Sequence, residues 1–173
     1  MTAARELFWA RGYSNVSVRD ITKSAGVDVA LVSRYFGSKQ GLFEATLAEI
    51  PTWEALEVDR DCVLAAAVAS FAHPCDPGTD ETNVFTMLLT NIIDPEMGGK
   101  IRCMVQRGLA DPLARKLGGN HAEERAALLL AALFGMALMR KNFRLDALAN
   151  KPQAETDAQI RHLAAAALEY GDV

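Results

Sequence analysis

Cysteine is scarce in this sequence, and its placement excludes the folds that depend on it. The three residues, Cys62, Cys75 and Cys103, form no CxxC pair and no other metal-ligand spacing. A disulfide framework or a zinc site is therefore not expected, and neither is a cofactor. Small buried thiols in a reducing cytoplasm are the interpretation that we favour over a redox switch.

Long apolar segments are also missing. The longest apolar run, Ala126–Met139, has 14 residues, whereas a membrane-spanning helix needs about 20. We therefore expect a soluble, cytoplasmic protein with no membrane partner.

Catalytic signatures are absent as well. The three histidines, His73, His121 and His162, have no carboxylate or cysteine at the spacing of a zinc or di-iron site. No GxSxG sequence and no Walker-type phosphate loop occurs. We therefore do not expect an enzyme.

Runs of β-branched residues are short, whereas alanine and leucine dominate the sequence. This composition favours helices over strands, and the 50% share of hydrophobic residues is enough for a packed core. We predict an all-α protein of about nine helices, with an N-terminal domain at residues 1–50 and a larger helical domain at residues 51–173. Beyond residue 50 the apolar periodicity predicts helices over Trp53–Ala72, Glu81–Ile93, Glu96–Leu117, His121 to about Phe143, and Thr156–Tyr170.

An excess of basic residues is missing too, because the net charge is −4. The charge is unevenly divided, however. Residues 1–50 carry six basic and five acidic side chains, and the remainder carries twelve basic and seventeen acidic ones. The excess acid therefore lies outside the first fifty residues, which leaves them compatible with salt-sensitive binding to a polyanion.

The first fifty residues carry the signals of consecutive short helices. A helix is predicted over Thr2–Arg11, with Gly12 as its end. Ser17 and Asp20 have the S-x-x-D spacing of a capping box, in which side chains satisfy free backbone donors at a helix start. Gly26 then ends this second helix in the left-handed conformation.

A third helix follows after a very tight turn. Asp28 is predicted as the N-cap of a two-turn helix, Val29–Phe36, which Gly37 ends, and Ser38 caps a fourth helix that runs toward Pro51. A helix, a tight glycine turn and a short second helix form the helix-turn-helix arrangement that places its second helix in the major groove of DNA.

The short helix Val29–Phe36 has two different faces. Val32 and Phe36 are spaced i,i+4 toward the core. The opposite face carries small side chains that allow entry into a groove about 12 Å wide, where Ala30 suits a thymine methyl and Ser33 suits a base edge or a phosphate. The residues predicted on this outer face are Val29, Ala30, Ser33 and Arg34.

Further polar groups flank this face. The hydroxyl of Tyr35 and the ammonium of Lys39 suit phosphate oxygens, and the N-termini of the second and fourth helices offer backbone N–H groups to an anion. Arg34 has two interpretations, a contact with DNA or a surface ion pair with Glu44 or another carboxylate.

The segment VSVRDITKSAGVDVALVSRYFGSKQGLF resembles the DNA-binding domain of the TetR family, and ARELFWARGY matches the family's usual lead-in helix. The resemblance covers residues 1–50. It implies a homodimeric regulator that binds a double-stranded, palindromic DNA operator, and it implies repression. The positions that the resemblance assigns to DNA contact are Ser17, Arg19, Val29, Ala30, Ser33, Tyr35 and Lys39.

Two features depart from the family pattern, and a third residue, Gly41, weakens a helix. Members commonly carry several residues ahead of the first helix, whereas this sequence begins within it, so either the start is shortened or the phosphate contacts of such an arm are lost. Position 33 is often tyrosine in the family and is serine here. Gly41 weakens the first turn of the fourth helix, at a cost of up to ~1 kcal/mol relative to alanine.

The segment Ala126–Met139 is apolar on every face, and such a helix is buried on every face. One monomer of this size hardly encloses it, although a central helix of a monomer is the alternative. Together with the resemblance of TNIIDPEMGGKIR and the apolar helix to one branch of the family's ligand-binding domains, this implies a two-fold, four-helix interface formed with the last helix. The predicted interface residues are Leu129, Leu133, Met136, Leu163 and Ala167.

Large, adaptable side chains of the second domain are candidates for a ligand pocket, although ordinary core packing explains the same pattern. The candidates are Trp53, Phe71, Phe85, Leu88, Met104, Leu130, Phe134 and Met139. The segment Asp94–Gly99 is a candidate hinge, with an ordinary connecting turn as the alternative. We expect a regulator that a small apolar molecule releases from DNA. The alternative is a helical small-molecule-binding protein that has lost DNA binding.

Overall fold

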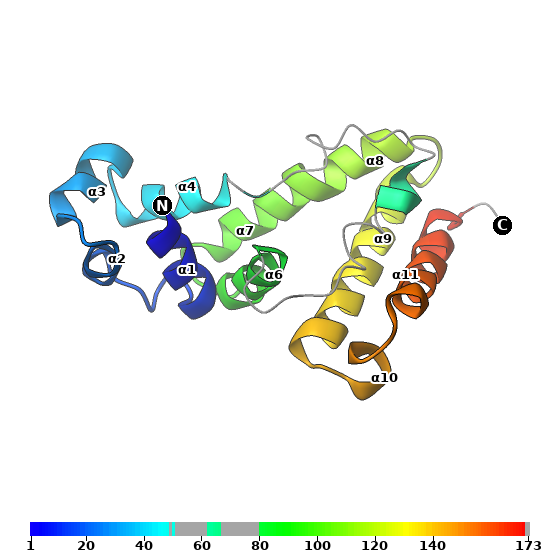
Figure 1. Cartoon of the computed structure of the whole chain (residues 1–173). Helices are drawn as coiled ribbons and strands as arrows, with labels where there is room; N and C mark the ends of the chain where they lie inside the picture. Colours follow the sequence, from blue (N-terminus) through cyan, green and yellow to red (C-terminus); the bar gives the residue numbers. More distant parts are fainter. Residues whose placement is uncertain (49, 51–61, 67–79, 172–173) are drawn as a thin grey trace. The chain divides into compact units, whose positions relative to one another are not determined.

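The computed structural model describes residues 1–48, 50, 62–66 and 80–171, and every regular element in these ranges is a helix (Figure 1). The all-α prediction is confirmed. The chain divides into two compact units. The first comprises Met1–Pro51 with Gly78–Cys103, and the second comprises Thr52–Pro77 with Met104–Val173. The first unit thus includes residues 78–103, which the predicted boundary at residue 50 places in the second domain.

Four short helices form the N-terminal part of the first unit: α1 (Thr2–Arg11), α2 (Val18–Ala25), α3 (Val29–Phe36) and α4 (Lys39–Leu47). Three predicted N-caps are confirmed, because the side chains of Ser17, Asp28 and Ser38 each accept a hydrogen bond from a backbone N–H of the helix that follows. Gly26 has a φ of 66°, the left-handed conformation that was predicted to end α2. Local sequence therefore specifies where these helices begin and end.

Three aromatic rings form the centre of the first unit. Phe8 lies 5.2 Å from Phe43 and 5.8 Å from Tyr13, measured between ring centroids, and Tyr13 lies 5.4 Å from Phe43. Two of the three pairs meet edge to face, a favoured geometry for aromatic rings. Beside them the indole N–H of Trp9 donates to the buried Thr46 hydroxyl at 3.2 Å. This cluster attaches α1 to α4.

A later helix, α6 (Asp80–Asn91), packs against α1. Its last residue, Asn91, is fully buried, and its amide oxygen accepts the backbone N–H of Tyr13 at 2.7 Å. The amide nitrogen of Asn91 donates to the carbonyls of Met87 and Phe8 at 2.9 and 3.4 Å. One side chain therefore satisfies backbone groups of both helices. The unit continues with α7 (Gly98–Val105) as far as Cys103.

The second unit contains η2 (Gln106–Ala110), α8 (Asp111–Leu117), α9 (Ala122–Ala137), η3 (Leu138–Asn142), α10 (Asp146–Ala149) and α11 (Gln153–Leu168). Helices α9 and α11 lie side by side (Figure 1). Their facing residues, including Leu129, Leu133 and Ile160, form a core with Leu113 and Leu117 of α8. Among the described residues, no helix combines the length and the apolar character needed to cross a membrane.

Several predicted helix limits are corrected by the structure. The predicted helix Glu96–Leu117 is three consecutive segments that begin at Gly98, and the middle one is a π-helical turn. The last helix begins at Gln153 rather than Thr156, and the short α10 was not predicted. Of the predicted helix Trp53–Ala72, only residues 62–66 lie within the described part of the chain.

Candidate nucleic-acid interface

Helix α3 is amphipathic in the way that a groove-binding helix requires. Val32 is buried against the unit, whereas Val29 is 45% exposed and Tyr35 is 69% exposed. Ala30, Ser33 and Arg34 are exposed as well. The outer face therefore presents small side chains along its centre, with an aromatic hydroxyl and a guanidinium at one end. A major groove admits an α-helix, and the role of this face in reading DNA stays a prediction.

The start of α2 is a complete capping box. The hydroxyl of Ser17 accepts the backbone N–H of Asp20 at 3.1 Å, and the Asp20 carboxylate accepts the backbone N–H of Ser17 at 2.9 Å. The hydrogen bonds from the side chain and then the backbone of Ser17 lower the pKa of Asp20. The Ser17 hydroxyl is therefore engaged and has a carboxylate beside it, whereas Arg19 on the first turn of α2 is exposed, and its contact with a phosphate stays a prediction.

The start of α4 places Lys39 over the ring of Tyr13, in a cation–π contact. The hydroxyl of Ser38 accepts the backbone N–H of Gly41 at 3.0 Å, which fixes the same turn. A Cβ at position 41 would collide with the carbonyl oxygen of Phe36. Gly41 therefore allows α3 and α4 to approach closely, which is a tertiary reason that the helix propensity of glycine does not reveal.

Arg34 does not pair with Glu44 in the structure. Its guanidinium carbon lies 5.8 Å from the centroid of the Tyr35 ring. Glu44 instead accepts hydrogen bonds from Lys100 of α7 and from Gln40, and these bonds lower the pKa of Glu44. The interpretation of Arg34 as an ion-pair partner of Glu44 is therefore wrong.

The turn between α6 and α7 is tied to the turn between α1 and α2. The carboxylate of Asp94 accepts the hydroxyl of Ser14 at 2.6 Å and its backbone N–H at 3.2 Å. It also accepts the backbone N–H groups of Glu96 and Met97 at 2.9 and 3.0 Å. Burial alone would raise the pKa of Asp94, but these hydrogen bonds outweigh it and lower the pKa.

Tyr13 lies between this turn and Lys39. Burial, followed by the nearby carboxylates of Glu96 and Asp94, raises the pKa of its hydroxyl. Sequence reasoning missed Tyr13, Asn91 and Asp94 as a group, because their contacts join segments about eighty residues apart. The candidate hinge Asp94–Gly99 is thus a hydrogen-bonded turn that leads into the first residues of α7, and its role as a hinge stays a prediction.

The predicted pocket residues are divided between the two units, and the pocket stays a prediction. Trp53 and Phe71 lie outside the described residues, as does the side chain of Phe85. Leu88 belongs to the first unit, and the remaining four belong to the second. Of these, Leu130 is buried and Phe134 packs against the same core, Met104 is partly buried, and Met139 is 37% exposed.

The predicted dimer residues fall on two faces of the second unit. Leu129, Leu133 and Ala167 are buried in the unit's own core, and Met136 packs against it. Leu163 is exposed on α11. The larger apolar side chains exposed on or next to these two helices are Leu128 of α9, Met139 of η3, Leu163 of α11 and Tyr170 beyond the end of α11.

The four N-terminal helices, with the exposed outer face of α3, define the chain as a helix-turn-helix protein of the all-helical class. Residues 1–46 match the bacterial regulatory proteins of the tetR family, and residues 61–168 match the tetracyclin repressor-like C-terminal domain. The chain belongs to the TetR family of transcriptional regulators, whose N-terminal helix-turn-helix is the DNA-binding domain.

Individual relatives agree with this assignment. The protein "Probable HTH-type transcriptional regulator YttP" of Bacillus subtilis is 51% identical over 43 residues, which span 25% of this chain and 21% of that protein. A crystal structure of a TetR-family regulator from Streptomyces coelicolor is 25% identical, with a TM-score of 0.50 over 96% of this chain and 91% of the other. A Mesorhizobium loti structure assigned to the same family shares the fold at 15% identity, with a TM-score of 0.58 over 96% and 92%.

Proposed function

We propose that the protein represses transcription as a cytoplasmic homodimer that binds a palindromic operator and leaves it when a small apolar molecule binds. The observation that carries the DNA-binding part is the outer face of α3. Val32 anchors this helix, while Ala30 and Ser33 face outward without bulk. Tyr35 near the end of α3, Arg19 of α2 and Lys39 of α4 would supply phosphate-binding groups around this face.

The experiment is a mobility shift over a range of salt concentrations, with DNA from upstream of the chain's own gene. Lys39→Ala should weaken binding for all sequences and lower the slope of log K against log[salt] by about one unit. Ser33→Ala should change the preferred base at one position in each half-site. Lys151→Ala is the matched control, because Lys151 lies in the second unit and pairs with Glu155 at 2.9 Å. Equal binding by all four proteins would refute the interface.

The dimer is proposed on the exposed apolar residues of α9 and α11. Leu128 and Leu163 are 41% and 39% exposed, and a two-fold axis would bury both on both chains. The core residues Leu129 and Leu133 then support the interface from beneath. The two heads of such a dimer would meet half-sites about one helical turn apart, or a multiple of it.

The proposed release of DNA by a ligand is based on the division of the chain into two units. A ligand that prefers a different arrangement of the body lowers operator affinity, and by linkage the operator lowers ligand affinity by the same factor. Hydrophobic metabolites would be screened by thermal shift, and each hit would be added to the operator titration. A tight ligand that leaves operator affinity unchanged would refute release. Ligand binding without any operator binding would favour the alternative of a helical small-molecule-binding protein.

A further inference from the structure

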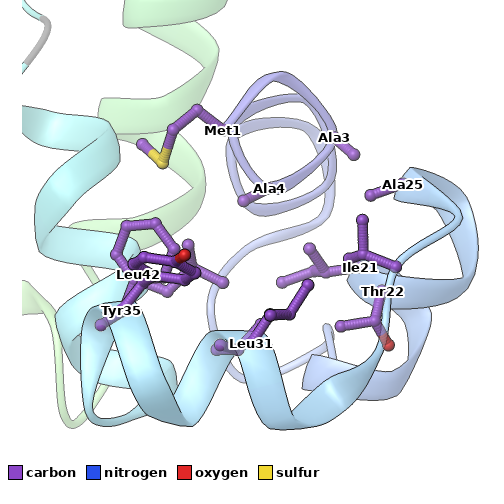
Figure 2. A pocket seen from close by; sticks show the side chains of 12 residues that line it. Met1, Ala3, Ala4, Ile21, Thr22, Ala25, Leu31, Tyr35 and Leu42 are labelled. Atoms are coloured by element: carbon purple, nitrogen blue, oxygen red, sulfur yellow. The ribbon is translucent and has the colours of Figure 1, made fainter.

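The first unit contains an apolar cavity between α1, α2, α3 and α4. Its volume is about 160 Å³. The side chains that line it converge from all four helices (Figure 2). Ala4, Ile21, Val32 and Leu42 form a buried floor. The cavity therefore lies inside the helix-turn-helix, apart from the residues predicted to bind an effector.

The mouth of the cavity is unusually apolar for a protein surface. The large exposed side chains at its edge are Met1, Val27, Leu31 and Tyr35, with exposed fractions of 38% to 69%. Exposed apolar side chains that cluster around a hollow mark a binding site more often than scattered ones do. Met1 at this edge is flexible enough to adapt to an occupant.

The lining determines the chemistry of the occupant. None of the lining side chains carries a charge, and the hydroxyl of Thr22 already donates to the Arg19 carbonyl at 3.2 Å. The Tyr35 hydroxyl at the edge is the other side-chain hydroxyl of the lining. A charged group among the buried side chains of the floor would lose its hydration without a charged side chain to replace it. An uncharged, largely hydrocarbon ligand has no such hydration to lose.

The volume of the cavity limits the size of the ligand. Pockets for drug-sized ligands are about 300–1,000 Å³, whereas an apolar cavity of about 150 Å³ stays dry and binds benzene. We infer that the helix-turn-helix unit binds a single-ring, uncharged aromatic molecule in this cavity, as a second small-molecule site besides the proposed effector site.

Occupation of the site bears on DNA binding, and this step rests on the proposed function. Leu31, Val32, Tyr35 and Phe36 of α3 line the cavity. Side chains that line the pocket lack contacts with other protein atoms on that side, so a ligand that touches all three helices would hold α3 more firmly against α1 and α2. If α3 is already held in its binding position, less ordering is needed when DNA binds, and the affinity for DNA is higher. We expect saturating ligand to strengthen operator binding by about fivefold, at the low end of common couplings.

Methyl NMR of the whole protein tests the site directly, with benzene as the probe and benzoate as the charged control. Saturable benzene-induced shifts are expected at the methyl groups of Ile21, Val32 and Leu42, and benzoate should cause none. Ala4→Leu fills the cavity from α1 and should abolish the shifts. Ala10→Leu is the matched control, because Ala10 is exposed on the same helix and does not line the cavity.

The absence of saturable shifts at these methyl groups, or equal shifts with benzoate, would overturn the site. So would unchanged shifts in a folded Ala4→Leu variant, and if that variant does not fold, the wild-type map decides alone. Operator titrations with and without benzene test the coupling, and an unchanged Kd would overturn it. A wild-type protein that binds no operator would contradict the proposed function, while the methyl titration would still decide the site.

Discussion

The ammonium nitrogen of Lys39 lies 4.1 Å from the centroid of the Tyr13 ring. The ring belongs to the aromatic cluster of α1 and α4, and the backbone N–H of the same tyrosine is held by Asn91 of α6. We expect the ammonium group of Lys39 to contact a DNA phosphate. The residue that positions this group, Tyr13, is thus also in contact with α6. Tyr13 therefore links α6, through its backbone, to Lys39 of α4, through its ring.

Tyr13→Leu should weaken operator binding by roughly two- to fivefold, because a cation–π contact at an accessible site contributes ~0.5–1 kcal/mol. Tyr13→Phe is the conservative control, since it keeps the ring and removes only the hydroxyl. Mobility shifts would be compared with circular dichroism, so that binding is measured on folded protein. If Tyr13→Phe bound as weakly as Tyr13→Leu, the ring would not be the positioning group.

The neighbouring glycines of α7 should respond oppositely to alanine. At Gly98 a Cβ would collide with the Ile92 carbonyl oxygen, so Gly98→Ala should destabilise the fold. At Gly99 a Cβ would meet only the end of the Arg102 side chain at 3.9 Å. Gly99→Ala should raise the free energy of unfolding by up to ~1 kcal/mol. Urea denaturation measures both variants, and destabilisation by Gly99→Ala would show that this glycine needs its conformational freedom.

Asp94 gives a pH dependence with a defined sign. Its pKa is lowered from the ordinary value of 3.8, so the stability that it contributes is complete above that value and is lost as pH falls through the lowered pKa. Ser14→Ala removes the hydroxyl that donates to the carboxylate. The stability difference between wild type and Ser14→Ala should be constant near neutral pH and shrink in acid. Denaturation over a pH series measures it, and a difference that grows in acid would contradict the assignment.

The two faces of the second unit should separate dimerisation from folding. Leu163→Asp places a charge on the exposed face and should give folded monomers, whereas Leu133 is 1% exposed and Leu133→Asp should unfold the unit. Ala158→Asp, on another exposed face of α11, is the control and should remain a dimer. Light scattering and circular dichroism measure both properties. A Leu163→Asp protein that stays dimeric would place the interface elsewhere.

The local part of this fold was accessible from sequence. The caps at Ser17, Asp28 and Ser38 and the left-handed turn at Gly26 depend on neighbours within three residues, so their residue types are sufficient evidence. The outward direction of Ala30 and Ser33 follows from helical periodicity once Val32 is placed inside. Their contact with DNA is a separate matter and stays a prediction.

The tertiary part was not accessible in the same way. Asn91 and Asp94 look like ordinary polar residues near a helix end until α1 lies beside them. Gly41 looks like a weak helix former until Phe36 approaches it. An apolar run such as Ala126–Met139 shows that a helix is buried, but it does not show which leucine faces its own core. Leu128 and Leu129 are adjacent in the sequence, but Leu128 is exposed and Leu129 is buried in the core.

The hydrogen bonds of Asn91 also bear on the order in which the protein folds. They join residues 78 and 83 positions apart in the sequence, and contacts of such long range close slowly. During synthesis from the N-terminus, α1 to α4 are complete well before Asn91 has been added. Until then the backbone N–H of Tyr13 lacks its partner, and α1 lacks the helix that packs against it. We expect chaperones to bind the nascent segment α1 to α4 until α6 emerges from the ribosome.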